Sequence, residues 1–389
     1  MESDRTAFPL RDPQAAHHSP ADDRERRVLA GSGTHGLGPI VLRVGDEAVT
    51  VRPGEEVDVR DGADSDAQVA VEFKSQEAFT DFHDEMRTAA GLHVTGGVRY
   101  LSGDFAGFDA WEPALRALYQ GRPVFDPADI DRDDASRTFR WGEDEDALSA
   151  FLQRYGWAHV RGVFSASEIA EIDAEVRRIE EASRPDVPGS WWTHDADGQE
   201  QPCQLHFLGL ASAVIAALDE DPRVRRLVAL NGMDLVSHPD RALGTFAVLK
   251  RPTAAEGLTN LPWHIDCGLG GHPFTCPGLH IGVQLTASNP GLGAFSILPG
   301  SHRSSVRRAD VDLETWPTVT VDAEPGDVTL HITHALHAAP GPQSRSEGRR
   351  TLYLGFSPPE LLDVIGPGQA FDDLITQTSA DGHVRFAAD

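Results

Sequence analysis

The chain is poor in cysteine, in basic residues and in long apolar runs, and each shortage narrows what it can be. Three cysteines among 389 residues fit a reducing compartment and no disulfide framework. The 34 basic residues face 61 acidic ones, a formal net charge of −27, which disfavours nucleic acid and anionic membranes as partners. No apolar run is long enough to cross a bilayer. Residues 1–27 lack the apolar core of a secretory signal, so we expect a disordered lead-in and a cytoplasmic protein.

The first part of the chain alternates strands and helices, which predicts a small α+β domain. Two strands flank the Gly45-Asp46 turn, and a helix begins after Ser75, a typical N-cap residue, and runs to about Ala90. A strand over 92–101 and a helix over 108–119 follow. The expected division of the chain is a lead-in at 1–27, the α+β domain at 28–125, a linker at 126–145 and a second domain at 146–389.

The second part begins with helices and then becomes mainly β. Residues 189–194, which include Trp191 and Trp192, look irregular and could line a pocket. Short strands separated by Pro- and Gly-rich turns predict a double-stranded β-helix, that is, a jelly roll of the cupin type, with flanking helices. The expected helices cover 146–155, 165–179, 213–218 and 223–230, and the expected strands cover 156–162, 245–250, 279–285, 294–298, 319–321, 327–332 and 351–356.

The segment Trp263-His264-Ile265-Asp266 is the strongest candidate for chemistry. On an extended strand His264 and Asp266 point to the same face, so an imidazole and a carboxylate could bind one metal. A second histidine would complete the 2-His-1-carboxylate triad of non-haem Fe(II) oxygenases. The strand before His334 and the turn after it offer His331, His334 and His337, and spacing alone does not choose between His334 and His337.

Other polar clusters are weaker candidates. His238 and Asp240 repeat the His-x-Asp pattern, but in a Pro-containing turn. Cys267, His272 and Cys276 lie close together and suggest zinc, yet they lack CxxC spacing and a fourth ligand, which favours buried free thiols, as for Cys203. An arginine at the start of a strand, Arg349 or Arg350, could bind a carboxylate through two hydrogen bonds.

Residues 146–356 resemble the phytanoyl-CoA dioxygenase family of Fe(II)/2-oxoglutarate oxygenases. Five pieces match in order, and they are the Phe151–Gly162 opening, Lys250-Arg-Pro252 ahead of Trp263-His-Ile-Asp266, Leu298-Pro-Gly-Ser-His302, Gly326-Asp327 ten residues before His337, and Arg349. The interval from His337 to Arg349 is twelve residues, one longer than expected. Arg349 rather than Arg350 keeps the register of the following strand.

The resemblance implies a set of roles. His264, Asp266 and His337 would hold Fe(II), and Arg349 would bind the far carboxylate of the co-substrate 2-oxoglutarate, with Gln284, Phe246 and Lys250 beside it. The expected activity is an O2-dependent hydroxylation that releases succinate and CO2. In related halogenases a small residue replaces the carboxylate, so Asp266 favours oxygenation.

The first domain resembles sterol-carrier-protein-like domains through Val69–Phe73, the helix from Ser75, Gly96-Gly97, Gly103-Asp104 and the helix over 111–118. That resemblance implies an apolar tunnel and favours a small, lipid-like or thioester-bound substrate, whereas a scaffold without a ligand is the alternative. Two other functions stay open: a non-catalytic ligand-binding protein, and a cupin-type metal dioxygenase that does not use 2-oxoglutarate. The sequence leaves the oligomeric state open.

Overall fold

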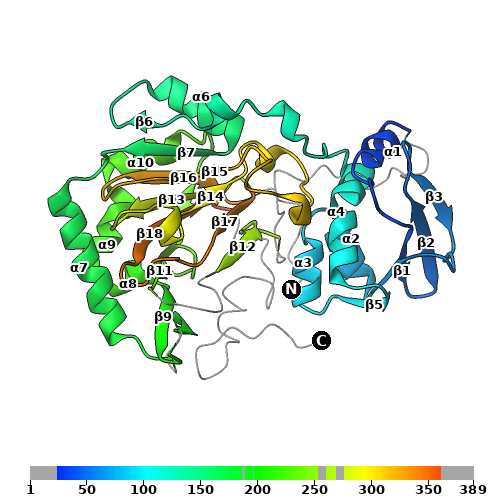
Figure 1. The fold of residues 1–389 in the computed structure, drawn as a ribbon, viewed down its shortest axis with the longest axis horizontal. Coiled ribbons are helices and arrows are strands. Elements are labelled where there is room, and N and C mark those ends of the chain that lie inside the picture. Colours follow the sequence, from blue (N-terminus) through cyan, green and yellow to red (C-terminus); the bar gives the residue numbers. More distant parts are fainter. Residues whose placement is uncertain (1–23, 186–188, 196, 253–259, 269–275, 361–389) are drawn as a thin grey trace.

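The computed structural model describes residues 24–185, 189–195, 197–252, 260–268 and 276–360. Two groups of elements lie side by side, a small unit formed by the N-terminal part and a larger β-rich unit (Figure 1). No helix in these ranges is both long and apolar enough to cross a membrane.

The N-terminal unit is a five-stranded sheet in the order β3-β2-β1-β4-β5 with helices packed on it. Its interior is filled with aromatic rings, such as Phe73, Phe82 and Phe108, whose centroids lie 5.2 to 6.1 Å apart. The elements are α1 (Arg24–Gly31), β1 (Ile40–Val44), β2 (Glu47–Arg52), β3 (Asp58–Asp61), β4 (Val69–Phe73), α2 (Gln76–His83), α3 (Ala89–Val94), β5 (Val98–Ser102) and α4 (Phe105–Gln120). The first helix begins at Arg24, inside the segment expected to be a disordered lead-in.

The helix expected from Ser75 to Ala90 is in fact two helices. Ser75 caps α2 as predicted, but the helix ends at His83. Glu85 then adopts φ +59°, a left-handed conformation that a non-glycine residue rarely takes, and its carboxylate is held by Arg122 at 2.7 Å. Thr88 starts α3 by accepting a hydrogen bond from the backbone N–H of Gly91. Since α3 continues to Val94, the expected strand over 92–101 is shortened to β5.

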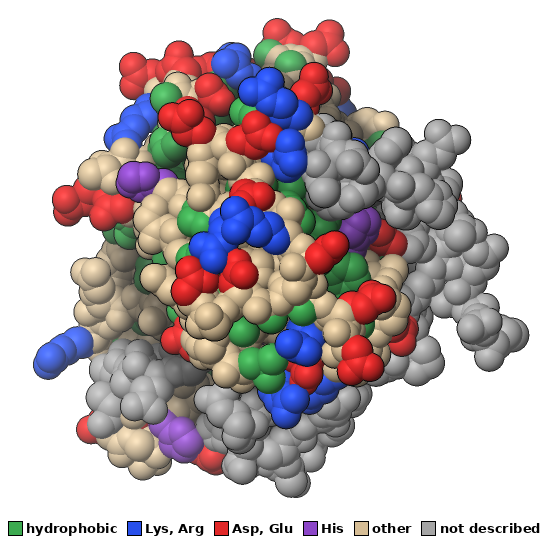
Figure 2. All heavy atoms as spheres, turned by 90° about the vertical axis from the view of Figure 1, so that its right-hand side faces the viewer, with side chains coloured by type: hydrophobic (Ala, Val, Ile, Leu, Met, Phe, Trp, Pro, Cys, Tyr) green, Lys and Arg blue, Asp and Glu red, His purple; other side chains and the backbone are tan. Residues whose placement is uncertain are grey.

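Acidic and basic side chains are mixed on the face that the N-terminal unit presents, and hydrophobic side chains are scattered there (Figure 2). Several of the acidic groups are paired. Arg52 contacts Asp64 and Asp66 at 2.6 and 2.7 Å, and Arg27 contacts Glu56 at 2.5 Å. In the N-terminal unit these carboxylates are therefore held against arginine side chains.

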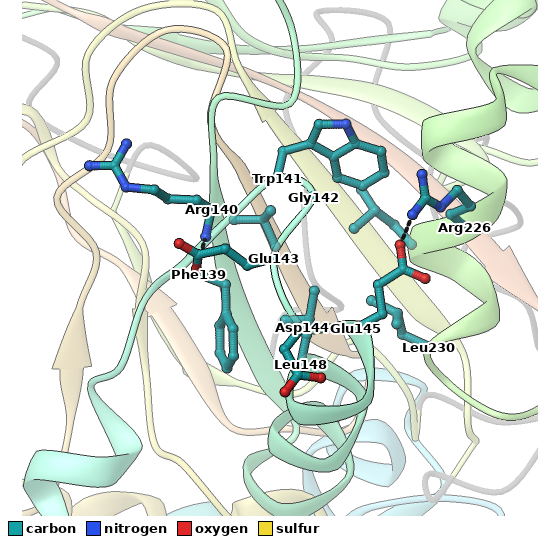
Figure 3. A pocket seen from close by; sticks show the side chains of 12 residues that line it. Phe139, Arg140, Trp141, Gly142, Glu143, Asp144, Glu145, Leu148, Arg226 and Leu230 are labelled. Atoms are coloured by element: carbon teal, nitrogen blue, oxygen red, sulfur yellow. Dashed lines mark hydrogen bonds and ion pairs between the residues drawn. The ribbon is translucent and has the colours of Figure 1, made fainter.

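The segment expected to be a linker is partly structured. It contains a 3-10 turn (Pro127–Asp129), α5 (Arg132–Ala135) and β6 (Phe139–Arg140), and β6 pairs in parallel with β7 (Trp157–Arg161). A small hollow next to β6 is lined by Trp141 and by the ion pair of Arg226 and Glu145 (Figure 3). At about 10 Å³ it has room for at most about one water molecule.

The larger unit is a double-stranded β-helix, as expected. Among the described residues, one sheet has the order β6-β7-β16-β13-β18-β11-β9-β8, with β10 also paired to β18, and the facing sheet has the order β12-β17-β14-β15. Its further elements are α6 (Glu145–Tyr155), α7 (Ala166–Ala182), β8 (Ser190–His194), β9 (Glu200–Leu205), α8 (Leu208–Ala211), α9 (Ala213–Ala216), α10 (Pro222–Ala229), β10 (Val236–Ser237), β11 (Thr245–Lys250), β12 (Leu261–His264), β13 (Leu279–Gln284), β14 (Ser296–Ile297), β15 (Val319–Thr320), β16 (Val328–Ile332), β17 (His337–Ala339) and β18 (Arg349–Ser357).

The helices of this unit cover the outer face of the large sheet. Ile169, Ile172 and Val176 of α7 belong to the same buried cluster as Leu330 of β16 and Leu354 of β18. A capping box begins α7, because Ser165 and Glu168 cap each other's backbone N–H groups. Residues 190–194, expected to be irregular, instead form β8 at the edge of this sheet. The candidate site lies on the opposite, inner side of this sheet.

Candidate active site

His264 and Asp266 lie close together, but they do not share one strand, which is what the sequence predicted. The strand β12 ends at His264, which pairs across to His337 of β17. Asp266 follows the strand, and its backbone N–H donates to the carbonyl of Thr333 at 2.8 Å. Pairing of β12 with β17, and not the alternation of side chains, therefore brings the three residues together.

The three side chains form a compact group of metal-ligand type. The Nε2 atoms of His264 and His337 each lie 3.6 Å from Oδ1 of Asp266, and the two ring centroids are 4.2 Å apart. Each imidazole has Nδ1 within hydrogen-bond distance of a backbone carbonyl two residues earlier, Pro262 at 2.7 Å and Ala335 at 2.9 Å. Because Nδ1–H donates there, Nε2 keeps its lone pair and faces the carboxylate.

The electrostatics favour the protonation states that a metal needs. Burial, together with the neighbouring imidazoles, lowers the pKa of His264 and of His337 to about 4, although 29% of the His264 side chain reaches solvent. Burial would raise the pKa of Asp266, but His337 and the hydrogen bonds from His280 and His331 hold it well below its ordinary value. At neutral pH the group is two neutral imidazoles and one carboxylate, the donor set that suits Fe(II).

The other oxygen of Asp266 is bound by two further histidines. Nδ1 of His280 lies 3.1 Å and Nε2 of His331 lies 3.3 Å from Oδ2. These histidines face each other across the β13–β16 pair. Asp266, His280 and His331 also satisfy the distance limits of a metal-binding group, so Asp266 is shared by two histidine pairs.

Of these two partners, His331 was expected from the sequence only as an alternative ligand, and His280 was not identified. The available signal was a histidine in each of two buried strands, but their register was not readable from sequence. His334, the remaining alternative, points elsewhere, since its Nδ1 lies 2.6 Å from the carbonyl of Cys276.

A cavity of about 290 Å³ opens beside these groups. Its walls are mainly apolar and aromatic, and the charged residues that line it are Asp266 in the histidine cluster, Arg349 and Arg308. The lining includes Thr88, Ala90, Trp191, Phe246, Arg308 and Tyr353. Phe246, which the family resemblance places beside the co-substrate, lies at the cavity, where its ring stacks on Tyr353 at 5.0 Å.

Arg349 is almost completely buried at the cavity, with 1% of its surface exposed. Its Nη1 donates to Thr351 Oγ1 at 2.7 Å, and that hydroxyl donates to Oε1 of Gln284 at 3.0 Å. Within the described residues Nε and Nη2 have no hydrogen-bond partner. Burial lowers the pKa of the guanidinium, while the neighbouring Tyr353 phenol opposes that effect. A buried cation with two unused donors fits a carboxylate ligand.

The remaining candidates lie behind this arginine or away from it. Arg350 points outward to Asp173 of α7, at 2.6 and 2.9 Å. Lys250 is paired in register with Arg349, and its ammonium donates to the carbonyl of Ala339 at 2.7 Å. Burial, followed by the charge of Arg349, lowers the pKa of Lys250 well below its ordinary value. Gln284 reaches Arg349 only through Thr351.

The alternative zinc cluster is not assembled within the described residues. Cys267 and Cys276 are buried free thiols, and Cys267 Sγ lies 3.1 Å from Thr333 Oγ1, while His272 lies outside the described residues. The second His-x-Asp pattern lies away from the cavity, next to the β10 edge strand, where His238 accepts the backbone N–H of Arg241 at its carbonyl.

A double-stranded β-helix that brings two histidines and a carboxylate to the wall of a cavity defines the class of non-haem metal oxygenases. Residues 152–351 match the phytanoyl-CoA dioxygenase (PhyH) family. The chain belongs to that family, and it is an Fe(II)- and 2-oxoglutarate-dependent dioxygenase. The prediction of this enzyme class is confirmed, and the non-catalytic and 2-oxoglutarate-independent alternatives are set aside.

The individual relatives have low sequence identity to this chain. The chain is 25% identical over 240 residues to a probable alpha-ketoglutarate-dependent hypophosphite dioxygenase of Stutzerimonas stutzeri, covering 56% of this chain and 80% of that protein. It is similar to the non-heme alpha ketoglutarate dependent epimerase SnoN from nogalamycin biosynthesis, at 25% identity and a TM-score of 0.42, with 55% of this chain and 81% of that chain covered. It is also similar to EctD from S. alaskensis with 2-oxoglutarate and 5-hydroxyectoine, at 19% identity and a TM-score of 0.45, with 61% and 82% covered. The resemblance of the N-terminal unit to sterol-carrier-like domains stays a prediction.

Proposed function

We propose that His264, Asp266 and His337 hold Fe(II), and that Arg349 binds the C5 carboxylate of 2-oxoglutarate. The observation that carries this assignment is the pairing, at one cavity, of a two-histidine, one-carboxylate group with a buried guanidinium whose Nε and Nη2 are unused. The bound metal and co-substrate supply the activation of O2, with release of succinate and CO2. The chain's own groups orient the ligands and keep water out of an apolar site.

Several contacts around the proposed centre support this assignment. Thr351 orients the guanidinium of Arg349, and Gln284 fixes the hydroxyl of Thr351. Lys250 lies next to Arg349 in the β11–β18 pair without lining the cavity, and its Nζ donates to the carbonyl of Ala339. Phe246 and Tyr353 stack on each other in the cavity wall, and the Phe246 ring lies 5.4 Å from the ring of His280.

We infer that the substrate is a small or apolar, acyl-type metabolite, hydroxylated at an unactivated C–H bond. The apolar walls of the cavity support this substrate class, because aromatic and aliphatic side chains bind hydrocarbon parts of a ligand in preference to ions. A screen would measure succinate release with acyl thioesters, free acyl acids and hypophosphite. Turnover confined to hypophosphite would contradict the apolar substrate.

The metal and co-substrate assignment is tested by anaerobic titration of the Fe(II)-loaded protein with 2-oxoglutarate, following the visible charge-transfer band of the chelate. His264→Ala should abolish the band, whereas His238→Ala, in the other His-x-Asp pattern, should keep it. Arg349→Ala should retain iron but bind 2-oxoglutarate far more weakly, because the co-substrate loses its bidentate partner. An unchanged titration in Arg349→Ala would refute the role of this arginine.

A further inference from the structure

The N-terminal unit reaches the catalytic cavity itself. Thr88, which begins α3, and Ala90 line the same cavity as the candidate metal ligands and Arg349. A smaller hollow of about 50 Å³ runs along the seam between the two units and shares Thr88, Ile265 and Arg308 with that cavity. The surface that a substrate meets is therefore built from both units.

Thr88 also binds the segment that carries Asp266. Its backbone N–H donates to the carbonyl of Gly268 at 2.9 Å, and its hydroxyl donates to the same carbonyl at 3.2 Å. Gly268 lies two residues after Asp266, and Thr88 is buried. Two donors on one carbonyl restrict the path of the chain immediately beyond the carboxylate.

The turn that presents Thr88 is rigidly held. Arg116, which is 1% exposed, donates to the carbonyls of Phe82 and Arg87 on either side of the turn, both at 2.5 Å. Glu112 accepts the backbone N–H of Ala89 at 3.1 Å. Within the turn, Glu85 keeps its left-handed φ of +59°. Strained backbone that persists because its surroundings enforce it is found preferentially at functional sites.

The two units are also joined by polar contacts near the turn. Arg308, which lines the cavity, pairs with Asp109 of α4, and Arg307 donates to the carbonyl of His35 at 3.1 Å. Ser305 exchanges backbone hydrogen bonds with Pro123 and Phe125, at 2.8 and 2.9 Å. These contacts fix the orientation of the N-terminal unit relative to the β-helix. A unit that forms part of the cavity wall needs a fixed orientation, whereas a carrier domain that moves freely does not.

We propose that the N-terminal unit is a structural part of the dioxygenase site, in which Thr88 positions the Asp266 segment and Ala90 forms the wall that limits the substrate. This inference rests on the proposed function. Both residues act on specificity and positioning, and neither is a metal ligand.

In the test, a side chain introduced at position 90 takes the place of the substrate. In Ala90→Tyr, incubated with Fe(II), 2-oxoglutarate and O2 but no other substrate, a ring facing the reacting centre should be hydroxylated. One oxygen atom of O2 enters the ring and the other enters succinate, while 2-oxoglutarate loses CO2. Peptide mass spectrometry should find one added oxygen at position 90. Ala106→Tyr, on the exposed side of α4, is the matched control and should stay unmodified.

The outcomes separate the inference from the proposed function. If the wild-type chain shows neither the 2-oxoglutarate band nor succinate, the proposed function fails and this inference falls with it. If Ala90→Tyr shows the band and forms succinate but residue 90 stays unmodified, the wall assignment is overturned while the proposed function stands. Equal oxidation of the Ala106→Tyr control would also overturn it.

A second measurement uses the unaltered chain, in case Ala90→Tyr does not fold. Amide hydrogen exchange is followed with and without Fe(II). Exchange of the Thr88 amide should slow by roughly tenfold or more on metal binding, because its acceptor, Gly268, lies in the segment that the metal orders. The Ala78 amide is the matched reference, since it is bound to the N-cap Ser75 of the neighbouring helix and should not respond. Equal behaviour of the two amides would overturn the positioning role of Thr88.

Discussion

Replacing His280 should weaken iron binding without removing it. The carboxylate of Asp266 divides its oxygens, with Oδ1 facing His264 and His337 and Oδ2 held by His280 at 3.1 Å and His331 at 3.3 Å. His280→Ala leaves one of the two donors on Oδ2. A hydrogen bond to a charged group contributes about 1.5–3 kcal/mol, and about 1.4 kcal/mol corresponds to a factor of ten. We therefore expect roughly a 10- to 100-fold rise in the Fe(II) dissociation constant, the range found for groups that orient metal ligands.

The assay is anaerobic competition for Fe(II) with a chromophoric chelator, together with the metal content per chain. His280→Gln, whose amide can still donate, should recover part of the affinity. His159→Ala is the matched control, because His159 is also buried in this sheet and also contacts a carboxylate, Asp327, at 3.1 Å, but away from Asp266. Complete loss of binding in His280→Ala, equal to that in His264→Ala, would make His280 a ligand and refute the positioning role. Two metal ions per chain would show that Asp266 bridges both histidine pairs.

Three further substitutions test other contacts. Thr351→Val removes the acceptor of Arg349 Nη1, so the KM for 2-oxoglutarate should rise about fivefold, or ~1 kcal/mol, at unchanged kcat. Asp109→Asn leaves Arg308 largely buried without its partner, and chemical denaturation should show a loss of about 2 kcal/mol in the free energy of unfolding. Burial, and after it His334, lowers the pKa of His302 to about 3 in the folded state. As the pH falls below the ordinary value of 6.5, the unfolded state therefore binds a proton that the folded state does not, and the free energy of unfolding decreases. His302→Gln should remove this loss of stability, which amounts to about 2 kcal/mol at pH 5.

For each of these substitutions, one result would contradict the expectation. A fall in kcat with unchanged KM in Thr351→Val would mean that the hydroxyl acts in the reaction and not in binding. Asp109→Asn with unchanged stability would show that Arg308 is satisfied by Glu112, 4.0 Å away. For His302→Gln, the wild-type and variant stability curves should run parallel above pH 6.5 and diverge below it, and parallel curves at all pH values would contradict the burial argument.

The parts of the fold that follow local rules were predictable from sequence. The strand over 245–250 has the expected bounds, and the capping box at Ser165 was readable from residue types alone. The pair His264 and Asp266 was found by its motif, although for a partly wrong reason, since the strand ends at His264. Choosing His337 among three histidines from geometry required the β12–β17 pairing, which is a tertiary feature.

The features that could not be predicted depend on contacts distant in sequence. The support of Asp266 by His280 depends on how β13 lies relative to the loop after β12, and no local pattern encodes that arrangement. The break between α2 and α3 depends on Arg116 and Arg122, some 30 residues further on, which stabilise a conformation that Glu85 would not adopt alone. Residues 190–194 were misread because two adjacent tryptophans hide the alternation typical of a strand.

Gly268 is one of the points at which the N-terminal unit contacts the β-helix, and it lies next to the candidate metal ligands. Its φ of +93° lies in the left-handed region that glycine adopts without strain, and this conformation directs its carbonyl toward Thr88. From the other side, Asp266 is tied through its N–H to Thr333 and through Oδ2 to two histidines. The candidate ligand is therefore held by the β-helix on one side and by the N-terminal unit just beyond it. A change in the position of the N-terminal unit would therefore be transmitted to the candidate metal ligand through residues 266–268. An independent lipid carrier domain would have no such influence on the metal site.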